Sequence, residues 1–282
     1  MAGRIAVRWR FSSLYMCEEC GSWTSLPRAS AFAQTSIHDS QEYYKHPYFD
    51  LRRAAVESQR RRCKELFARI AAAIDTSSLR GQRMLDIGCD TGGLLKAAQA
   101  EYGIMPVGLD VAARAVEVAK ANGLEAYHAS IEEAPAQVAG FRIVTAIDLV
   151  EHVVDPRVFL REVWSRLHPG GLLYVETPNI RSVVYRFGRA LGLVTGNRPL
   201  ALFERLFPPE HIQYFTPRSL ERVAREVGFE VVSVGTRPLP ASDISASFFA
   251  VASVQVLQML DRLKGSGILI CAVLRRPRES IA

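Results

Sequence analysis

A glycine-rich turn that follows a short apolar run is the first part of the chain that could bind a ligand. Within Met84 to Leu95, Asp86 ends the apolar run, and Gly88 and Gly92 lead into a helical pattern. Glycine is needed where the backbone bends with positive φ or where a ligand approaches it closely. The spacing departs from the dinucleotide fingerprint G-x-G-x-x-G, and the preceding acid would repel a pyrophosphate. Asp86 therefore favours a ligand with a cationic amino group.

A second carboxylate stands at the corresponding place in the next apolar run. Asp110 ends the run that begins at Met105, and it follows Asp86 by 24 residues. An acid at the carboxyl edge of a parallel sheet can accept hydrogen bonds from both hydroxyls of a ribose. The glycine turn alone would suit a plain strand–turn–helix junction equally well. The two acids together predict a site for a nucleoside cofactor.

Acid and imidazole groups follow a third apolar run, Phe141 to Ala146. Asp148, Glu151 and His152 come soon after this run, and His211 lies further along the chain. An imidazole can remove a proton from a hydroxyl near neutral pH, so His152 is the first candidate for a catalytic base and His211 the second. Alternatively, His152 begins a helix and only shapes the pocket, and His211 is hydrogen-bonded to backbone in a loop. Two carboxylates and an imidazole could also hold a metal ion with open positions.

The elements that must position these residues alternate along the chain from Arg83 onward. Apolar runs that predict strands alternate with helical patterns, which indicates βαβ units, a parallel sheet and helices on both of its faces. We expect strands over 84–87, 105–109, 141–146, 172–176, 230–234 and 268–274, and helices over 51–74, 94–101, 112–121, 157–167 and 219–227. The first helix should bury a face formed by Cys63, Leu66, Phe67, Ile70 and Ile74.

The glycine turn resembles the first motif of the class I S-adenosylmethionine-dependent methyltransferases, an acid followed by alternating glycines. The resemblance implies an α/β, Rossmann-like fold with a mostly parallel seven-strand sheet, helices on both faces, and S-adenosylmethionine as cofactor. By this resemblance the methionine part of the cofactor faces Asp86, Gly88, Cys89, Asp90 and Gly92, the ribose faces Asp110, the adenine borders Val111, Ser130 and Ile131, and Asp148 and Leu149 complete the site.

Two positions depart from the family pattern. Asp90 stands where the family usually has glycine, although aspartate tolerates the left-handed backbone region better than most residues. Family members often carry an acid near the position of Ser130, and this chain has none there. Asp90, together with the lone pair of Cys17 and Cys20, keeps open the alternative of a catalytically inert partner protein with the methyltransferase fold.

Later segments resemble one subgroup, which includes the ubiquinone-biosynthesis O-methyltransferases and methyltransferases of surface polysaccharides. They are 146–156, 168–179, 210–217 and 220–234. The resemblance implies methyl transfer to an oxygen of a small molecule, such as a sugar, a lipid-linked saccharide or a phenolic lipid; an N-methyltransferase acting on an amino sugar is the alternative. A divalent metal has been assigned to a similar acid cluster in the ubiquinone enzymes, but Glu-His is common in the subgroup without metal, and we predict none. The motif of enzymes that methylate flipped bases is missing after the fourth strand, so no nucleic-acid partner is expected.

The chain divides into three zones. Residues 1–50 are expected to be irregular, with Cys17 and Cys20 as the remnant of a zinc knuckle. Residues 51–277 form the methyltransferase domain, and 278–282 a tail. An insert at about 179–215 mixes apolar residues with arginines. It is predicted to be a lid that suits a lipid-linked or phosphate-bearing acceptor, or else a helical hairpin with a solvated arginine face.

Composition sets the broad class. Of 282 residues, 49% are hydrophobic and 23% charged, which excludes a largely disordered chain, and five cysteines are too few for a disulfide-stapled miniprotein. Lys and Arg exceed Asp and Glu by 35 − 29 = 6. We expect a cytoplasmic protein, with contact to the inner membrane surface as a further option. The apolar row Phe249, Ala252, Val256, Met259 and Leu263 should pack on the protein body, or alternatively lie on a membrane.

Overall fold

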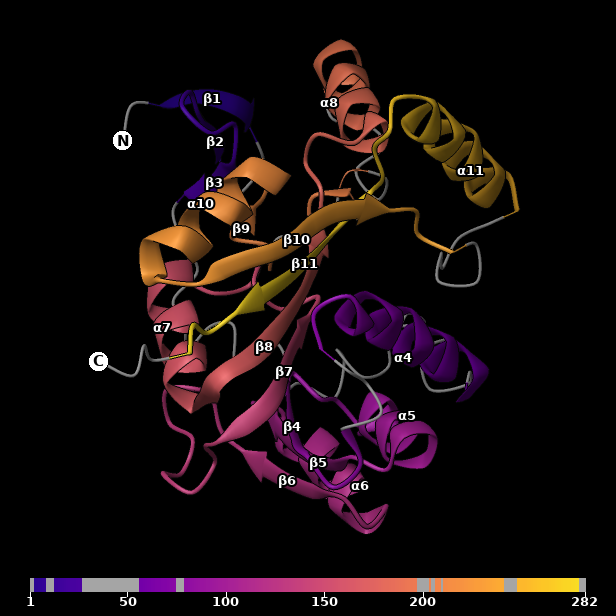
Figure 1. The fold of residues 1–282 in the computed structure, drawn as a ribbon. Coiled ribbons are helices and arrows are strands. Elements are labelled where there is room, and N and C mark those ends of the chain that lie inside the picture. Colours follow the sequence, from indigo (N-terminus) through magenta and orange to yellow (C-terminus); the bar gives the residue numbers. More distant parts are fainter. Residues whose placement is uncertain are drawn as a thin grey trace.

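A seven-stranded sheet forms the body of the protein (Figure 1). The computed structural model describes residues 3–8, 13–26, 56–74, 79–196, 203, 206–208, 210–240 and 248–278. The strands are β4 (Arg83–Ile87), β5 (Met105–Asp110), β6 (Glu125–His128), β7 (Phe141–Ile147), β8 (Leu167–Pro178), β10 (Glu230–Arg237) and β11 (Leu269–Arg275). Their order is β10-β11-β8-β7-β4-β5-β6, and β11 is antiparallel to both neighbours while the remaining pairs are parallel. The predicted mostly parallel, seven-strand, Rossmann-like α/β fold is confirmed.

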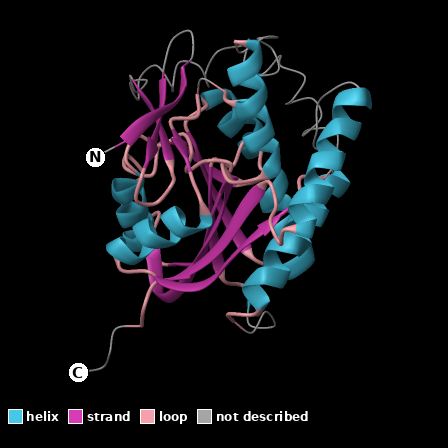
Figure 2. Cartoon of the chain, turned by 90° about the horizontal axis from the view of Figure 1, so that it is seen from above, coloured by secondary structure: helices cyan, strands magenta, loops and turns pink. Residues whose placement is uncertain are grey.

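Helices cover both faces of this sheet (Figure 2). On one face lie α4 (Val56–Ala71), α5 (Gly93–Tyr102) and α6 (Ala113–Ala121), and on the other α7 (Pro156–Arg166) and α10 (Pro217–Val227). Side chains alternate between the two faces along each strand. In β4, Met84 packs with Phe67 of α4, whereas its neighbour Leu85 belongs to the cluster that holds Phe159 of α7. The predicted buried face of α4 is confirmed through Cys63, Leu66, Phe67 and Ile70.

Local capping signals fix the ends of α10, which begins two residues before the predicted range of 219–227 and ends at its predicted last residue. The Thr216 hydroxyl accepts a hydrogen bond from the backbone N–H of Ser219, and Pro217 occupies the first turn. Gly228 ends the helix with φ of 109°, a left-handed conformation that glycine adopts without strain. The helix leads directly into β10.

A second, four-stranded sheet joins the start of the sequence to a short strand about 190 residues later in the chain. Strands β1 (Gly3–Arg8), β2 (Ser13–Cys17) and β3 (Trp23–Leu26) form antiparallel pairs, and β3 pairs with β9 (Gln213–Tyr214). The prediction that residues 1–50 are irregular is therefore wrong for these segments. Neighbouring residues do not predict these strands, because β3 pairs with β9, a two-residue strand that lies far away in the chain. We call β1 to β3 the N-terminal ribbon.

Two further helices, α8 (Val183–Thr195) and α11 (Phe248–Leu263), pack on each other beyond the sheet (Figure 1). The prediction that the apolar row of α11 packs on the protein body is wrong. Val256 and Leu263 of that row are 63% and 76% exposed, and Met259 is exposed as well. The side chain of Phe249 lies outside the described residues.

Polar side chains decide which face α11 turns inward. The Gln258 amide accepts a hydrogen bond from the backbone N–H of Leu239 at 2.6 Å and donates one to its carbonyl oxygen at 3.1 Å. The Asp261 carboxylate accepts the N–H of Val183, at the start of α8, at 2.8 Å. Both side chains are buried, so these bonds are made where water does not compete for them. Of the helices that the structure describes, none combines the length and apolar character needed to span a membrane.

A buried ionic network joins four elements beneath the carboxyl edge of the sheet. Both carboxylate oxygens of Glu176, in β8, accept hydrogen bonds from Arg237 of β10, at 2.6 and 2.9 Å. Tyr174 donates to one of these oxygens at 2.9 Å, and Arg62 of α4 lies 3.3 Å from the other. Arg62 also reaches Asp148 after β7, at 3.1 Å. A charge buried in this way is tolerated only while its partners are present.

We predict that Glu176→Gln lowers the free energy of unfolding by about 3 kcal/mol, since Arg237 would be left as a buried charge without its carboxylate. Chemical denaturation of both proteins measures the difference. The matched control is Glu226→Gln, which removes a partly exposed carboxylate paired with Arg157 and Arg222 and should cost less than about 1 kcal/mol. Equal losses in the two variants would contradict the assignment of Glu176 to the core of the network.

Candidate functional site

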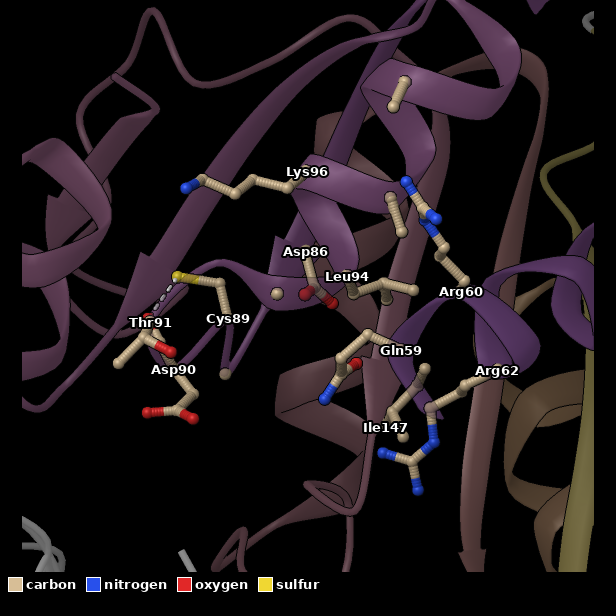
Figure 3. Close-up of a pocket in the computed structure, with 14 residues that line it drawn as sticks. Gln59, Arg60, Arg62, Asp86, Cys89, Asp90, Thr91, Leu94, Lys96 and Ile147 are labelled. Carbon is tan, nitrogen blue, oxygen red and sulfur yellow. Dashed lines mark hydrogen bonds between the residues drawn. The ribbon is translucent and has the colours of Figure 1, made fainter. Parts of the chain in front are cut away.

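A cavity of about 330 Å³ opens at the carboxyl edge of the main sheet (Figure 3). Four of the predicted cofactor residues line it, namely Asp86, Gly88, Cys89 and Asp90. The first turns of α5 form a second wall, and Ile147, the last residue of β7, lies across from them. This is the edge at which open α/β sheets bind ligands.

Helix α4 supplies a wall that the sequence analysis missed. Gln59, Arg60 and Arg62 project from it toward the cavity (Figure 3). Gln59 lies against the glycine turn, because a methyl group placed on Gly93 would come within 3.0 Å of its Cγ. The sequence analysis predicted only the buried face of this helix and assigned no role to its arginines. Arg60 and Arg62 lie on either side of that face, and only the packing of α4 over the turn shows what they contact.

The glycine turn has the backbone conformation that its residues predict. Gly88 and Gly92 have φ of 75° and 82°, and Asp90 has φ of 47°. Aspartate at the position usually taken by glycine therefore adopts the left-handed region, as expected. The N–H groups of Gly88 and Cys89 both donate to the carbonyl oxygen of Leu109, at 2.8 and 3.0 Å. These bonds fasten the turn to the end of β5.

Asp86 is buried at the floor of the cavity. Its carboxylate accepts a hydrogen bond from the Thr145 hydroxyl at 2.6 Å. Burial raises the pKa of Asp86 to about 7, the nearby charge of Asp110 also raises it, and the Thr145 hydrogen bond and Arg62 oppose that rise. A ligand that brings a positive charge to this carboxyl group would stabilise its ionised form.

Asp110 fastens the glycine turn from the next strand. Its two carboxylate oxygens accept the backbone N–H groups of Asp90, at 2.8 Å, and of Ala112, at 2.9 Å. Burial raises the pKa of Asp110, and these two hydrogen bonds work against that rise. Each carboxylate oxygen has a second lone pair, so ribose hydroxyls can bind to the same group. Asp110 thus orders the turn as well as being a candidate ligand for the ribose.

The remaining predicted cofactor residues lie around the cavity without lining it. A methyl group placed on Gly88 would lie 3.3 Å from Leu149, so this leucine packs beside the turn. The carbonyl oxygen of Val111 is 3.0 Å from His128, and the Ser130 hydroxyl accepts the N–H of Glu133 at 3.3 Å. Others outside the lining are Gly92, Asp110, Asp148 and Ile131, the last of which is buried in the main core. Their cofactor contacts stay predictions.

The two candidate bases lie side by side next to this edge. The rings of His152 and His211 meet edge to face, with centroids 4.7 Å apart. Nδ1 of His152 is 3.1 Å from the carbonyl oxygen of Glu210, which can only accept, so in the neutral ring this nitrogen carries the proton and Nε2 carries the lone pair. Desolvation lowers the pKa of His211 well below its usual value. His211 is therefore neutral near pH 7 and a weaker base than an unperturbed imidazole.

The composition of the acid–histidine cluster differs from the predicted one. Glu151, His152 and His211 each bring one ligand atom to within 4.8 Å of the others, whereas Asp148 turns toward Arg62. One carboxylate and two imidazoles are ligand types that suit a divalent ion. The Thr177 hydroxyl, however, already donates to Glu151 at 2.8 Å, so the cluster is also satisfied as a hydrogen-bonded network.

The N-terminal ribbon holds the segment that carries His211. Ser25 donates its N–H to the carbonyl oxygen of Ile212 at 2.8 Å, and the hydroxyl of Thr24 donates to the Gln213 side chain at 3.0 Å. On the opposite side, the N–H groups of Ile212 and Gln213 both donate to the carbonyl oxygen of Glu151, at 2.9 Å. The ribbon and the acid–histidine cluster therefore fix the same strand from two sides.

Comparison with known proteins places this architecture in a family. A family model described as a methyltransferase domain matches residues 55–234, more than half of the chain. The ubiquinone biosynthesis O-methyltransferase of Aromatoleum aromaticum is 32% identical over 165 residues, which are 56% of this chain and 68% of that protein. The protein of the same name from Bordetella avium is 33% identical over 161 residues, which are 54% of this chain and 64% of that protein. The chain thus matches about two thirds of the length of these relatives.

Solved structures share the fold at low sequence identity. Phosphoethanolamine N-methyltransferase 2 of Haemonchus contortus, in complex with S-adenosylmethionine, has a TM-score of 0.59 and 15% identity, and the match covers 91% of this chain and 62% of that one. The [4+2]-cyclase SpnF has a TM-score of 0.52 and 18% identity, with 76% and 81% of the two chains covered. The fold alone therefore does not define the reaction. The family model and the relatives at about a third identity, together with the fold, show that this chain belongs to the S-adenosylmethionine-dependent methyltransferases of class I.

Proposed function

We propose that the chain transfers the methyl group of S-adenosylmethionine to an oxygen of a small molecule, drawn from sugars, lipid-linked saccharides and phenolic lipids. The observation that carries this proposal is the contact between His152, which follows β7, and His211, which precedes β9. A hydroxyl acceptor must lose its proton when it attacks the methyl group, and a positioned imidazole accepts that proton.

The cavity residues fit the cofactor by charge and shape. When bound, S-adenosylmethionine supplies an electrophilic methyl group on a sulfonium. Asp86 offers a buried carboxylate to its amino group, and the backbone of Gly88 to Asp90 lies along its methionine part. Asp110 accepts the ribose hydroxyls while it holds the turn. Val111, Ser130 and Ile131 border the adenine, and Leu149 packs beside the turn.

His152 acts as the base, and His211 positions it. The carbonyl oxygen of Glu210 fixes the tautomer of His152, so that Nε2 receives the proton of the acceptor hydroxyl. His211 stays neutral and keeps the neighbouring ring in place by edge-to-face contact. The neighbouring His152 also lowers the pKa of His211, because two positive charges side by side would repel each other.

The two relatives described above are named O-methyltransferases, which supports oxygen as the acceptor atom. Their cofactor half would look the same if the acceptor were the nitrogen of an amino sugar. An inert protein with this fold is the remaining alternative. It would owe its inertness to Asp90, whose carboxylate stands in the cofactor turn in place of a glycine.

We expect S-adenosylmethionine and S-adenosylhomocysteine to bind to the wild type, and Asp110→Asn to weaken both at least about ten-fold. The asparagine cannot accept from Asp90, Ala112 and two ribose hydroxyls as a carboxylate does. Isothermal titration calorimetry measures the affinities. Asp155→Asn is the matched control, since asparagine caps α7 as well as aspartate does. A folded wild type that binds neither ligand would refute the enzyme and leave the inert partner.

The affinity for S-adenosylmethionine should decrease as the pH falls below about 7, because Asp86 becomes protonated and loses the charge that binds the amino group. Asp86→Asn should bind more weakly at pH 8 and show no such dependence between about pH 6 and pH 8.

The pKa of Asp86 is raised on folding, so in the cofactor-free protein its contribution makes the free energy of unfolding fall as the pH rises from about 4 to about 7. A pH-independent affinity in the wild type would show that this carboxylate does not hold the cofactor.

Removal of the base should slow chemistry without loss of the cofactor. We expect His152→Asn to reduce kcat about a hundred-fold or more, with the Kd for S-adenosylmethionine changed less than about two-fold. The acceptor for this assay is chosen by screening catechols and lipid-linked sugars. His168→Asn, which changes an exposed histidine at the start of β8, is the control and should keep wild-type kcat. A His152→Asn enzyme with unchanged kcat would mean that the imidazole only shapes the pocket.

A further inference from the structure

A second hollow, of about 190 Å³, lies away from the cofactor cavity between α8 and the N-terminal ribbon. One face of α8 forms its wall, because Arg186, Arg189, Ala190 and Leu193 recur at steps of three and four residues. The opposite side is Trp23 of the ribbon. The hollow therefore combines two guanidinium groups with an apolar lining.

The two arginines of this hollow, Arg186 and Arg189, form no ion pair with any acid among the residues that the structure describes. Helix α8 carries no acidic residue. The carboxylate of Asp261, which Arg186 influences at a distance, is buried and bound to the backbone of Val183. The positive charge of the wall is thus available to an anion.

The side chain of Arg189 is held in place by an aromatic ring, but one of its hydrogen-bond donors has no acceptor among the described residues. Its guanidinium lies over the indole of Trp23, with the central carbon 5.6 Å from the ring centroid. Its Nε is buried and makes no hydrogen bond to any described residue. A buried donor without an acceptor is costly, and a ligand oxygen in the hollow would remove that cost. Arginine presents its N–H groups in a fork that matches phosphate oxygens.

Apolar surface continues from the rim of the hollow. Leu193 lines it and is 73% exposed, and the next residue, Val194, is 86% exposed. Phe187, two turns earlier on the side of Val194, is exposed too. Helix α11, which packs against α8, also exposes an apolar row. A free phosphate would use only the arginines, whereas a phosphate attached to a hydrocarbon chain would use both features.

We propose that this hollow binds the phosphate group of a phosphate-bearing lipid, with Arg186 and Arg189 as its ligands and Leu193 and Val194 as the start of the path for its chain. The site deepens the proposed function and rests on it, because it assigns the acceptor to the lipid-linked class. Tyr185, in the wall of the hollow, packs against Tyr214, whose ring centroid is 5.8 Å from that of His211. Two successive ring contacts, Tyr185 to Tyr214 and Tyr214 to His211, therefore connect the wall of the hollow with the candidate bases.

The test measures binding of farnesyl monophosphate, farnesol and inorganic phosphate by calorimetry, below the concentration at which the lipids form micelles. We expect farnesyl monophosphate to bind at least about ten-fold more tightly than either of the other two. Arg186→Gln and Arg189→Gln should each weaken it about ten-fold. Arg218→Gln, the same change at an exposed position on α10, should leave the affinity within about two-fold.

Three results would overturn the proposal. Equal binding of farnesol would show that phosphate is not recognised, equal binding of inorganic phosphate would point to a free anion, and no binding of farnesyl monophosphate by the folded wild type would remove the site. Arg186 is exposed, so its variant should keep the wild-type melting temperature and remains informative if Arg189→Gln is destabilised. S-adenosylhomocysteine binding is measured on the same samples. Asp110→Asn should lose that ligand and keep farnesyl monophosphate, so failure of the cofactor site and failure of the lipid site are told apart.

Discussion

The buried carboxylate of Glu176 is the interaction on which the cofactor cavity depends. It binds Arg237 of β10 and reaches Arg62 of α4, and Arg62 in turn binds Asp148 at the end of β7. These contacts hold α4 over the glycine turn and set the direction in which the chain leaves β7. The same network of buried charges therefore positions both the α4 wall of the cavity and the start of the acid–histidine segment. A network of this kind favours one arrangement, because any other would bury an unpaired charge.

Asp110 plays a comparable part on the other side of the cavity. Its carboxylate accepts N–H groups from Asp90 in the glycine turn and from Ala112 after its own strand. The residue expected to bind the ribose is thus also the residue that keeps the turn in its left-handed conformation. Asp90 fits this arrangement because its backbone N–H, not its side chain, makes the bond. The departure from glycine at this position is therefore compatible with the fold of the turn.

What the sequence predicts well is what local chemistry decides. Three predicted features depend on neighbouring residues and are confirmed by the structure: the strand over 84–87, the glycine turn and the end of α10 at Val227. The wall of α4 and the N-terminal ribbon depend on contacts between distant segments. Arg62 shows no signal of its network before Glu176 is placed beside it, and β3 becomes a strand by pairing with Gln213 and Tyr214. Side-chain pattern alone carries no information on such partners.

Helix α11 shows why periodicity can identify a helix and yet mistake its inward face. The apolar pattern predicts that Val256, Met259 and Leu263 face inward. In the structure these residues are exposed, and Gln258 and Asp261 are buried instead. Each of these polar groups satisfies backbone atoms that would otherwise lack a partner, at Leu239 and at the start of α8. Such bonds outweigh apolar burial when the alternative leaves buried N–H groups unpaired. The outward apolar face of α11 is the consequence.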